Sequence, residues 1–285
     1  MNLINAKDYH QVICALRDFF MEQGYIEVPT QSRLSILAAC EDPTTIGQFD
    51  YNGQVWPLPQ TGQMWLEYEL LKNPDYRGVF CQSTSYRQEA NPVAGRHDLI
   101  FPMFEFEGRG TMKDLMKLEA ELCEFLQLTP SPQSNVIDIV PYNDACKKYK
   151  VQFIGDKEEE LLQRDHGNVV FLTEFPERTS PFWNMKRSQG VTGQVMQDVA
   201  NKVDVIIHGM ETIGSAERET DPDIMRSRFH SISNGMYADL LFAHFGRERV
   251  LKELEDFLAL PMVPRFGGGM GITRLIRALK LKGTL

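Results

Sequence analysis

The chain has 285 residues, of which 42% are hydrophobic and 24% are charged, and its formal net charge is −9. This is an ordinary globular composition for one large domain or two small ones, with enough apolar residues for a sizeable core. The acidic balance works against nonspecific binding of nucleic acids and other polyanions, although a local basic patch can coexist with it.

The five cysteines lie far apart in the sequence, form no CxxC pair and are odd in number. The sequence therefore predicts neither a zinc site nor a disulfide framework, and the reducing cytoplasm is the compartment that fits best. The N-terminus lacks the basic stretch and apolar run of a signal peptide, and no segment approaches about 18 uninterrupted apolar residues. We expect no membrane insertion.

No internal repeat or linker divides the chain, so we expect residues 1–285 to form one continuous domain. The first element in chain order is a helix over residues 8–23, predicted from apolar side chains at helical spacing. Gly24 follows as a plausible end of this helix. The helix leads into an extended stretch at residues 25–28.

Further elements follow at intervals along the chain. The capping box from Thr111 to Asp114 predicts the start of a second helix, and the charged run at residues 156–160 predicts a solvated helix start. Apolar runs predict strands at residues 79–86, 100–106, 169–172 and 203–207. Helices therefore flank a sheet built from segments that are distant in sequence, which is an α+β fold.

The first segment with chemical content is YRQEANPVAGRHDLIFPMFEFE at residues 86–107, where two strands bracket a polar loop. The loop gathers cations suited to an anionic ligand, and Phe101 offers a ring for stacking. The polar residues that stand out are Arg87, Glu89, Arg96 and His97. The alternative is a surface hairpin with ordinary salt bridges, which is the default interpretation of such a loop taken alone.

The second segment is PRFGGGMGITRLIRALK at residues 264–280, where glycines lead directly into an amphipathic helix that carries Arg274 one turn inside. Glycines allow close approach to the backbone, a helix N-terminus favours anions, and Arg274 adds a fixed charge. The run matches neither a nucleotide P-loop nor a dinucleotide-binding fingerprint. A tight packing joint between a strand and a helix is the competing interpretation.

The third segment is VDVIIHGMETIGSAERE at residues 203–219, which carries Asp204, Glu211 and Arg218. Two carboxylates near phosphate-binding cations are typical of a Mg²⁺ site, because Mg²⁺ is held by few carboxylates together with phosphate oxygens of the substrate. We interpret His208 as a packed side chain, since no second histidine lies at metal-binding spacing.

In their order and spacing these segments resemble the catalytic core of the class II aminoacyl-tRNA synthetases, in the asparaginyl and aspartyl subgroup. Residues 86–107 resemble motif 2, residues 267–274 resemble motif 3, and residues 16–30 resemble motif 1. PQTGQMWLE at residues 59–67 is similar to the segment that lines the amino-acid pocket, and residues 167–186 resemble a later core strand. The resemblance covers nearly the whole chain and implies an antiparallel sheet flanked by helices.

This resemblance implies ATP-dependent, AMP-forming activation of an amino acid, with ATP and Mg²⁺ as cofactors. The catalytic residues would be Arg87 and Arg274. The ATP-binding residues would be Arg87, Glu89, Arg96, His97, Phe101, Glu211, Gly271 and Arg274. The amino-acid-binding residues would be Gln63, Glu67, Glu105 and Arg218, and the metal ligands would be Asp204 and Glu211. The resemblance also implies a homodimer that forms through motif 1.

The sequence departs from the family pattern at informative places. Leu66 occupies the position of the lysine with which aspartyl enzymes hold the substrate carboxylate, which argues for asparagine as the substrate. Pro29 is shifted relative to the proline usual in motif 1. The chain begins at motif 1, so we expect no N-terminal OB-fold that reads the anticodon.

Three hypotheses for the final step remain open. The first is an asparaginyl-tRNA-synthetase-like ligase that transfers the aminoacyl group to tRNA or another nucleophile. The second is an asparagine-synthetase-type enzyme, in which ammonia attacks an aspartyl adenylate; the expected lack of an OB-fold favours it and Leu66 opposes it. The third is a non-catalytic paralogue that binds a partner or an amino acid, and the complete ATP-site pattern opposes that hypothesis.

Overall fold

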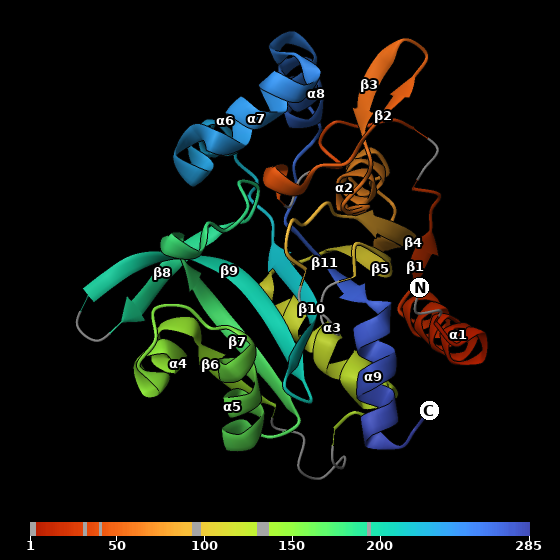
Figure 1. The fold of residues 1–285 in the computed structure, drawn as a ribbon, viewed down its shortest axis with the longest axis vertical. Coiled ribbons are helices and arrows are strands. Elements are labelled where there is room, and N and C mark those ends of the chain that lie inside the picture. Colours follow the sequence, from red (N-terminus) through yellow and green to blue (C-terminus); the bar gives the residue numbers. More distant parts are fainter. Residues whose placement is uncertain (1–3, 31–32, 40–41, 93–97, 130–136, 193–194) are drawn as a thin grey trace.

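The computed structural model describes residues 4–30, 33–39, 42–92, 98–129, 137–192 and 195–285. Within these ranges nine strands form one sheet in the order β1-β4-β5-β11-β10-β9-β7-β6, with β8 paired to β9 (Figure 1). Neighbouring strands are antiparallel, except that β1 is parallel to β4 and β6 is parallel to β7. The strands are β1 (Tyr25–Glu27), β4 (Gly78–Tyr86), β5 (Ile100–Arg109), β6 (Asp138–Pro141), β7 (Val169–Pro176), β8 (Arg187–Thr192), β9 (Val195–Ile207), β10 (Met210–Glu217) and β11 (Arg265–Gly271).

The helices form three groups around the sheet (Figure 1). The first group is α1 (Ala6–Glu22), α3 (Met112–Phe125) and α9 (Ile272–Lys282), whose apolar sides form the largest core with one face of the sheet. The second is α4 (Tyr142–Tyr149) and α5 (Asp156–His166), which pack against β6 and β7. The third is α2 (Gln63–Lys72), α6 (Pro222–Ser231), α7 (Met236–Phe245) and α8 (Arg247–Leu258), together with the small hairpin β2 (Gln48–Tyr51) and β3 (Gln54–Pro57). The α+β fold predicted from the sequence is confirmed.

The structure contains the helices and strands that the clearest sequence patterns predicted. The opening helix is α1, the capping box of Thr111 and Asp114 starts α3, and the charged run lies at the start of α5. The four predicted strands are β4, β5, β7 and the second half of β9. None of the helices in the described part of the chain is long and apolar enough to cross a bilayer.

The glycine run leads directly into α9, as predicted, but Gly267 to Gly271 themselves lie in a strand that was not predicted, β11, between β5 and β10 in the sheet. Here glycine is a packing requirement. A Cβ atom on Gly267 would overlap the carboxyl group of Glu107, and one on Gly268 would lie 2.5 Å from Cβ of Ser215. The neighbouring strands therefore fill the space above and below β11 with their own side chains.

Beneath β10, the carboxyl group of Glu119 on α3 is fully buried in the apolar core. Burial raises its pKa to about 8, and the charge of Asp204 adds to this rise, while the nearby hydroxyl group of Ser215 opposes it. The folded protein therefore holds a proton that the unfolded chain releases near the ordinary pKa of 4.5. The stability gained from this proton is fully present below about pH 4.5 and is lost as the pH rises to about 8.

We predict that Glu119→Gln weakens the loss of stability between pH 5 and pH 9. The difference in the free energy of unfolding between these two pH values should shrink by about 2–4 kcal/mol, because one pKa unit corresponds to about 1.4 kcal/mol. Urea denaturation at both pH values measures this. Glu121→Gln is the matched control, since Glu121 lies on the same helix with a 40% exposed side chain. An equal pH dependence in Glu119→Gln and in the wild type would contradict the prediction.

Candidate active site

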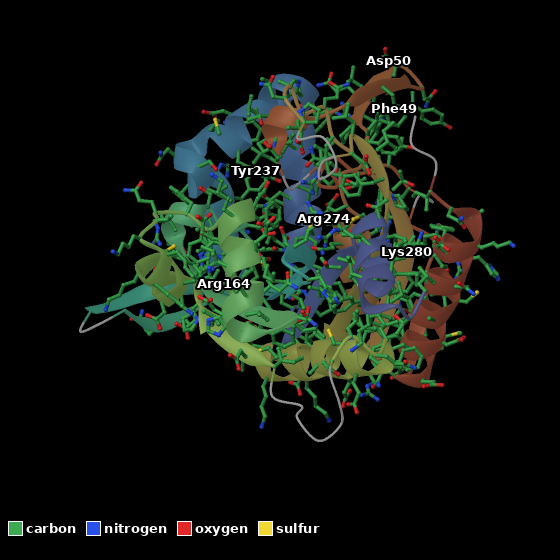
Figure 2. The ribbon with its side chains drawn as sticks, turned by 60° about the horizontal axis from the view of Figure 1, so that its bottom comes forward. Phe49, Asp50, Arg164, Tyr237, Arg274 and Lys280 are labelled. Atoms are coloured by element: carbon green, nitrogen blue, oxygen red, sulfur yellow. The ribbon has the colours of Figure 1, made fainter. Side chains whose placement is uncertain are left out.

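A cavity of about 670 Å³ lies on the face of the sheet opposite α1 and α3. The start of α9 borders this cavity, and α7 with the loop before it closes one side. Figure 2 shows Arg274 and Tyr237 inside the molecule, whereas Phe49 and Asp50 lie at the outer tip of the β2–β3 hairpin. The residues predicted from the sequence that line this cavity are Gln63, Glu67, Arg87, Glu89, Phe101, Glu211, Arg218, Gly271 and Arg274. Arg96 and His97 lie outside the described residues.

One wall of the cavity is formed where β4 ends and β5 begins. The guanidinium carbon of Arg87 lies 5.6 Å from the centre of the Phe101 ring. The backbone N–H of Arg87 donates to the carbonyl oxygen of Leu99 at 2.8 Å, which continues the pairing of the two strands. A cation and an aromatic face thus lie together on a rigid hairpin end, as needed to hold an anion beside a flat ring.

A second wall, next to the start of β5, is the junction between β11 and α9. Gly271 ends the strand and is also the residue before the first turn of α9, so no loop separates the two elements. Arg274, one turn into the helix, donates from Nη1 to the carbonyl oxygen of Glu211 at 2.8 Å. The same nitrogen lies 3.7 Å from the Glu211 carboxylate. The N-terminus of α9 and the guanidinium group of Arg274 both favour an anion at this end.

The predicted metal ligands differ in their surroundings. Glu211 lines the cavity with a 38% exposed side chain, whereas Asp204 is buried behind Lys202. Nζ of Lys202 lies 2.8 Å and 2.9 Å from the two carboxylate oxygens of Asp204. Burial raises the pKa of Asp204 to about 7, and Lys202 opposes that rise. Within the described ranges, no group of three or more His, Cys, Asp or Glu side chains is arranged to hold a metal ion.

Beside the cavity lies a buried charge cluster made of Glu67, Glu107, Arg218 and Arg265, of which Glu67 and Arg218 line the cavity. Oε2 of Glu67 accepts from Nε of Arg265 at 2.9 Å and from Nη2 at 2.6 Å. Oε1 of Glu67 accepts from the side-chain amide of Asn184 at 2.6 Å. Both oxygens of Glu67 are thus in use, and Oε1 already serves as the acceptor for an amide group.

Arg218 connects this cluster to the start of α2. Its Nε donates to Oε1 of Glu107 at 3.0 Å, and its Nη2 donates to Oε1 of Gln63 at 2.9 Å. Burial raises the pKa of Glu107 to about 8, against the opposing effect of Arg218. Gln63 is the first residue of α2 and lines the cavity. Arg218 therefore holds the side chain of Gln63 where a ligand in the cavity would approach the charge cluster.

Glu105, predicted to contact the amino acid, does not line the cavity. Its carboxylate accepts from the backbone N–H of Gly62 at 2.7 Å and from the hydroxyl groups of Thr61 and Ser83. Glu105 is fully buried beneath these groups. The structure therefore gives Glu105 contacts that hold the start of α2 in position.

Besides Glu107 of the charge cluster, three residues of the site were missed in the sequence. Lys202 precedes Asp204 by two positions on one strand, so strand alternation alone could have placed both on one face. Arg265 lies two positions before Gly267, and the motif pattern gives it no role. Asn184 lies in an irregular segment before β8, where no periodicity indicates which way a side chain points.

Comparison with known proteins is consistent with this geometry. The family model of the class II tRNA synthetases (D, K and N) matches residues 4–282. The asparagine–tRNA ligase of Pelotomaculum thermopropionicum is 24% identical over 91% of this chain and 62% of its own length. The aspartate–tRNA(Asp) ligase of Thermoplasma volcanium is 24% identical over 80% of this chain and 56% of its own length.

Among solved structures, the asparaginyl-tRNA synthetase from Pyrococcus horikoshii complexed with asparaginyl-adenylate has the same fold, with a TM-score of 0.76 at 21% identity. That match covers 96% of this chain and 64% of the other. The chain thus spans less than two thirds of the length of these similar proteins.

We predict that Arg265→Met destabilises the protein by about 3–5 kcal/mol, because it leaves Glu67 buried without its main counter-charge. Chemical denaturation measures the free energy of unfolding. Arg33→Met is the control, since the ion pair of Arg33 with Glu69 is about one third exposed and its loss should cost about 1 kcal/mol or less. Equal decreases in the free energy of unfolding in the two variants would show that the buried ion pair stabilises the protein no more than the exposed one.

Proposed function

Because the chain belongs to the class II tRNA synthetases of the D, K and N type, we propose that it activates an amino acid with ATP to form an aminoacyl-adenylate. The observation that carries this proposal is that two different sets of side chains line one cavity. One set is Arg87, Phe101 and Arg274. The other set is Glu67 and Arg218, the two members of the buried charge cluster that reach the cavity, and it suits the polar side chain of a small amino acid.

In the proposed reaction, a carboxylate oxygen of the amino acid attacks the α-phosphorus of ATP, and the bond to pyrophosphate breaks in line with it. The negative charge that develops on the α-phosphoryl oxygens is stabilised by Arg87. Arg274 and the N-terminus of α9 bind the departing phosphates, while Phe101 stacks on the adenine. The products are the aminoacyl-adenylate and pyrophosphate, and no proton is transferred in this step.

A magnesium ion would neutralise charge on the triphosphate when bound, and Glu211 is a carboxylate at the cavity surface with the chemistry to hold it. Asp204 does not fit this role in its present contacts, since both of its oxygens lie against Lys202. The steps above therefore depend on the protein's own cations.

For the side chain of the amino acid, we propose asparagine. Oε1 of Glu67 already accepts the amide of Asn184, so this oxygen is suited to an amide donor. Leu66, expected from the sequence to distinguish asparagine from aspartate, does not line the cavity and packs with Leu70 and Val79, so the preference rests on Glu67. The acceptor in the second step is tRNA or another nucleophile, and attack by ammonia on an aspartyl adenylate is the alternative that product analysis distinguishes.

We also propose that residues 1–285 act as one catalytic domain and that two copies form a symmetric dimer through α1 and β1. The strand β1 pairs with β4 on one side. Beside it, Met21 is 53% exposed and Ile26 is 42% exposed. An apolar edge of this kind is commonly covered by an identical partner.

Arg87→Ala should abolish ATP–pyrophosphate exchange while the fold is retained. Loss of a positioned charge at a transition state costs about 3 kcal/mol or more, or at least about a hundredfold in rate. Arg226→Ala is the control, because Arg226 lies on α6 with exposed partners, Asp223 and Glu255. Undiminished exchange in Arg87→Ala, with circular dichroism unchanged, would refute the role of Arg87.

Asparagine should support the fastest exchange among the twenty amino acids. Aspartate would bring a second carboxylate against Glu67, whereas a substrate amide can donate to it. Rates of exchange at a fixed concentration of each amino acid measure the preference. Mass spectrometry after addition of ammonia or total tRNA identifies the final product. A clear preference for aspartate, with asparagine formed from ammonia, would replace this proposal by the asparagine-synthetase alternative.

Light scattering should give twice the mass of the chain, and Ile26→Lys should reduce it to the mass of a monomer, because a charge at this strand edge opposes pairing. Ile224→Lys is the matched control, as Ile224 is 40% exposed on α6 away from β1. A monomeric wild type that is fully active would exclude this dimer.

A further inference from the structure

Lys202 is held at the predicted metal site by contacts on two sides. Its Nζ lies 2.8 Å and 2.9 Å from the oxygens of Asp204. The same nitrogen lies 4.0 Å from the centre of the Phe175 ring. The side chain of Lys202 is 23% exposed and that of Asp204 is 10% exposed. This is a partly buried ion pair against an aromatic face, and such a pair has a much more defined geometry than a surface lysine.

The position of this ammonium group coincides with the region where a divalent ion was predicted. Asp204 lies opposite Gly214 in the pairing of β9 with β10. A Cβ atom on Gly214 would lie 3.6 Å from Oδ1 of Asp204 and 3.2 Å from Oε1 of Glu211. The two carboxylates therefore face one small volume, and Lys202 already neutralises the deeper of the two.

A cation bound here would lie within a few ångströms of the Lys202 ammonium group. At such distances like charges repel strongly in a partly buried site, even with the screening that protein interiors provide. Lys202 also lines the cavity together with Glu211 and Arg274. Its charge is therefore available to an anion that enters the cavity, as well as to Asp204.

We propose that Lys202 is a built-in cation that replaces a divalent ion at Asp204 and contacts the phosphate groups of the bound nucleotide. Asp204 holds Lys202 in position. Glu211 is then the carboxylate that can bind a divalent ion from solution. The contact with a nucleotide phosphate rests on the proposed function. The exclusion of a metal ion from Asp204 rests on the ion pair alone.

The test is the binding of Mn²⁺ to the full chain without nucleotide, at about pH 8, measured by electron paramagnetic resonance of free Mn²⁺. Lys202→Met should bind one Mn²⁺ at least about tenfold more tightly than the wild type, because Asp204 and Glu211 then face the ion together. Lys186→Met is the matched control, since Lys186 pairs with Glu217 at 2.9 Å and is not part of the cavity wall. It should bind Mn²⁺ as the wild type does.

Asp204→Asn provides a second test that keeps the size of the side chain. In the wild-type background it should leave Mn²⁺ affinity unchanged, whereas in combination with Lys202→Met it should remove the gain. A drop in affinity for Asp204→Asn alone, or no gain for Lys202→Met, would overturn the proposal. Equal gains in Lys202→Met and Lys186→Met would overturn it as well, since they would reflect only the change in net charge.

Nucleotide binding separates this proposal from the proposed function. Titration of ATP in the absence of divalent ions should show binding to the wild type and at least about tenfold weaker binding to Lys202→Met. Unchanged ATP affinity in that variant would refute the phosphate contact. If ATP binds but no amino acid supports exchange, the proposed function fails while the assignment of Lys202 stands.

Discussion

The structure depends on the pairing of four charges that have been removed from water. Glu67 comes from α2, Glu107 from β5, Arg265 from β11, and Arg218 from the residue after β10. Isolated charges at such depth would be very costly, so each requires its partners in position. The cluster thereby fixes α2 against three strands of the sheet. It also gives the adjoining cavity wall its polar character before any ligand arrives.

The same requirement explains the distribution of charge around the cavity. The chain as a whole is acidic, with a net charge of −9, but Arg87, Lys202 and Arg274 line one cavity. Each of these side chains has a contact that holds it in place. Arg87 lies against the ring of Phe101, and Arg274 donates to the carbonyl oxygen of Glu211. Lys202 lies against the carboxylate of Asp204 and the ring of Phe175. Positive charge is thus concentrated at fixed points, where local geometry matters more than the overall balance.

Sequence patterns predicted the elements whose burial is periodic, such as α1, α3 and β4, because hydrophobic spacing directly reports the buried face. They missed β11 as a strand, since glycines carry no such pattern and only its two neighbours make it extended. At the site, motif spacing selected Arg87, Glu211 and Arg274, which all line the cavity. The sequence also predicted Glu105 and Asp204 as site residues. In the fold, however, the carboxylate of Glu105 binds groups at the start of α2 and that of Asp204 binds Lys202. Sequence spacing alone does not indicate such contacts between distant segments.

Glycines at three positions of β11 that line the cavity, Gly267, Gly269 and Gly271, also determine the shape of the cavity. In an ordinary sheet, side chains from alternate strands are kept apart by those of the strand between them. Here Arg218, which follows β10, reaches across Gly267 to Glu107 on β5. The backbone of β11 is therefore the bottom of a trough between β5 and β10, which lie two strand spacings apart. Such a width is set by the hydrogen-bonded ladder and is independent of rotamer changes, so this dimension of the cavity is as rigid as the sheet itself.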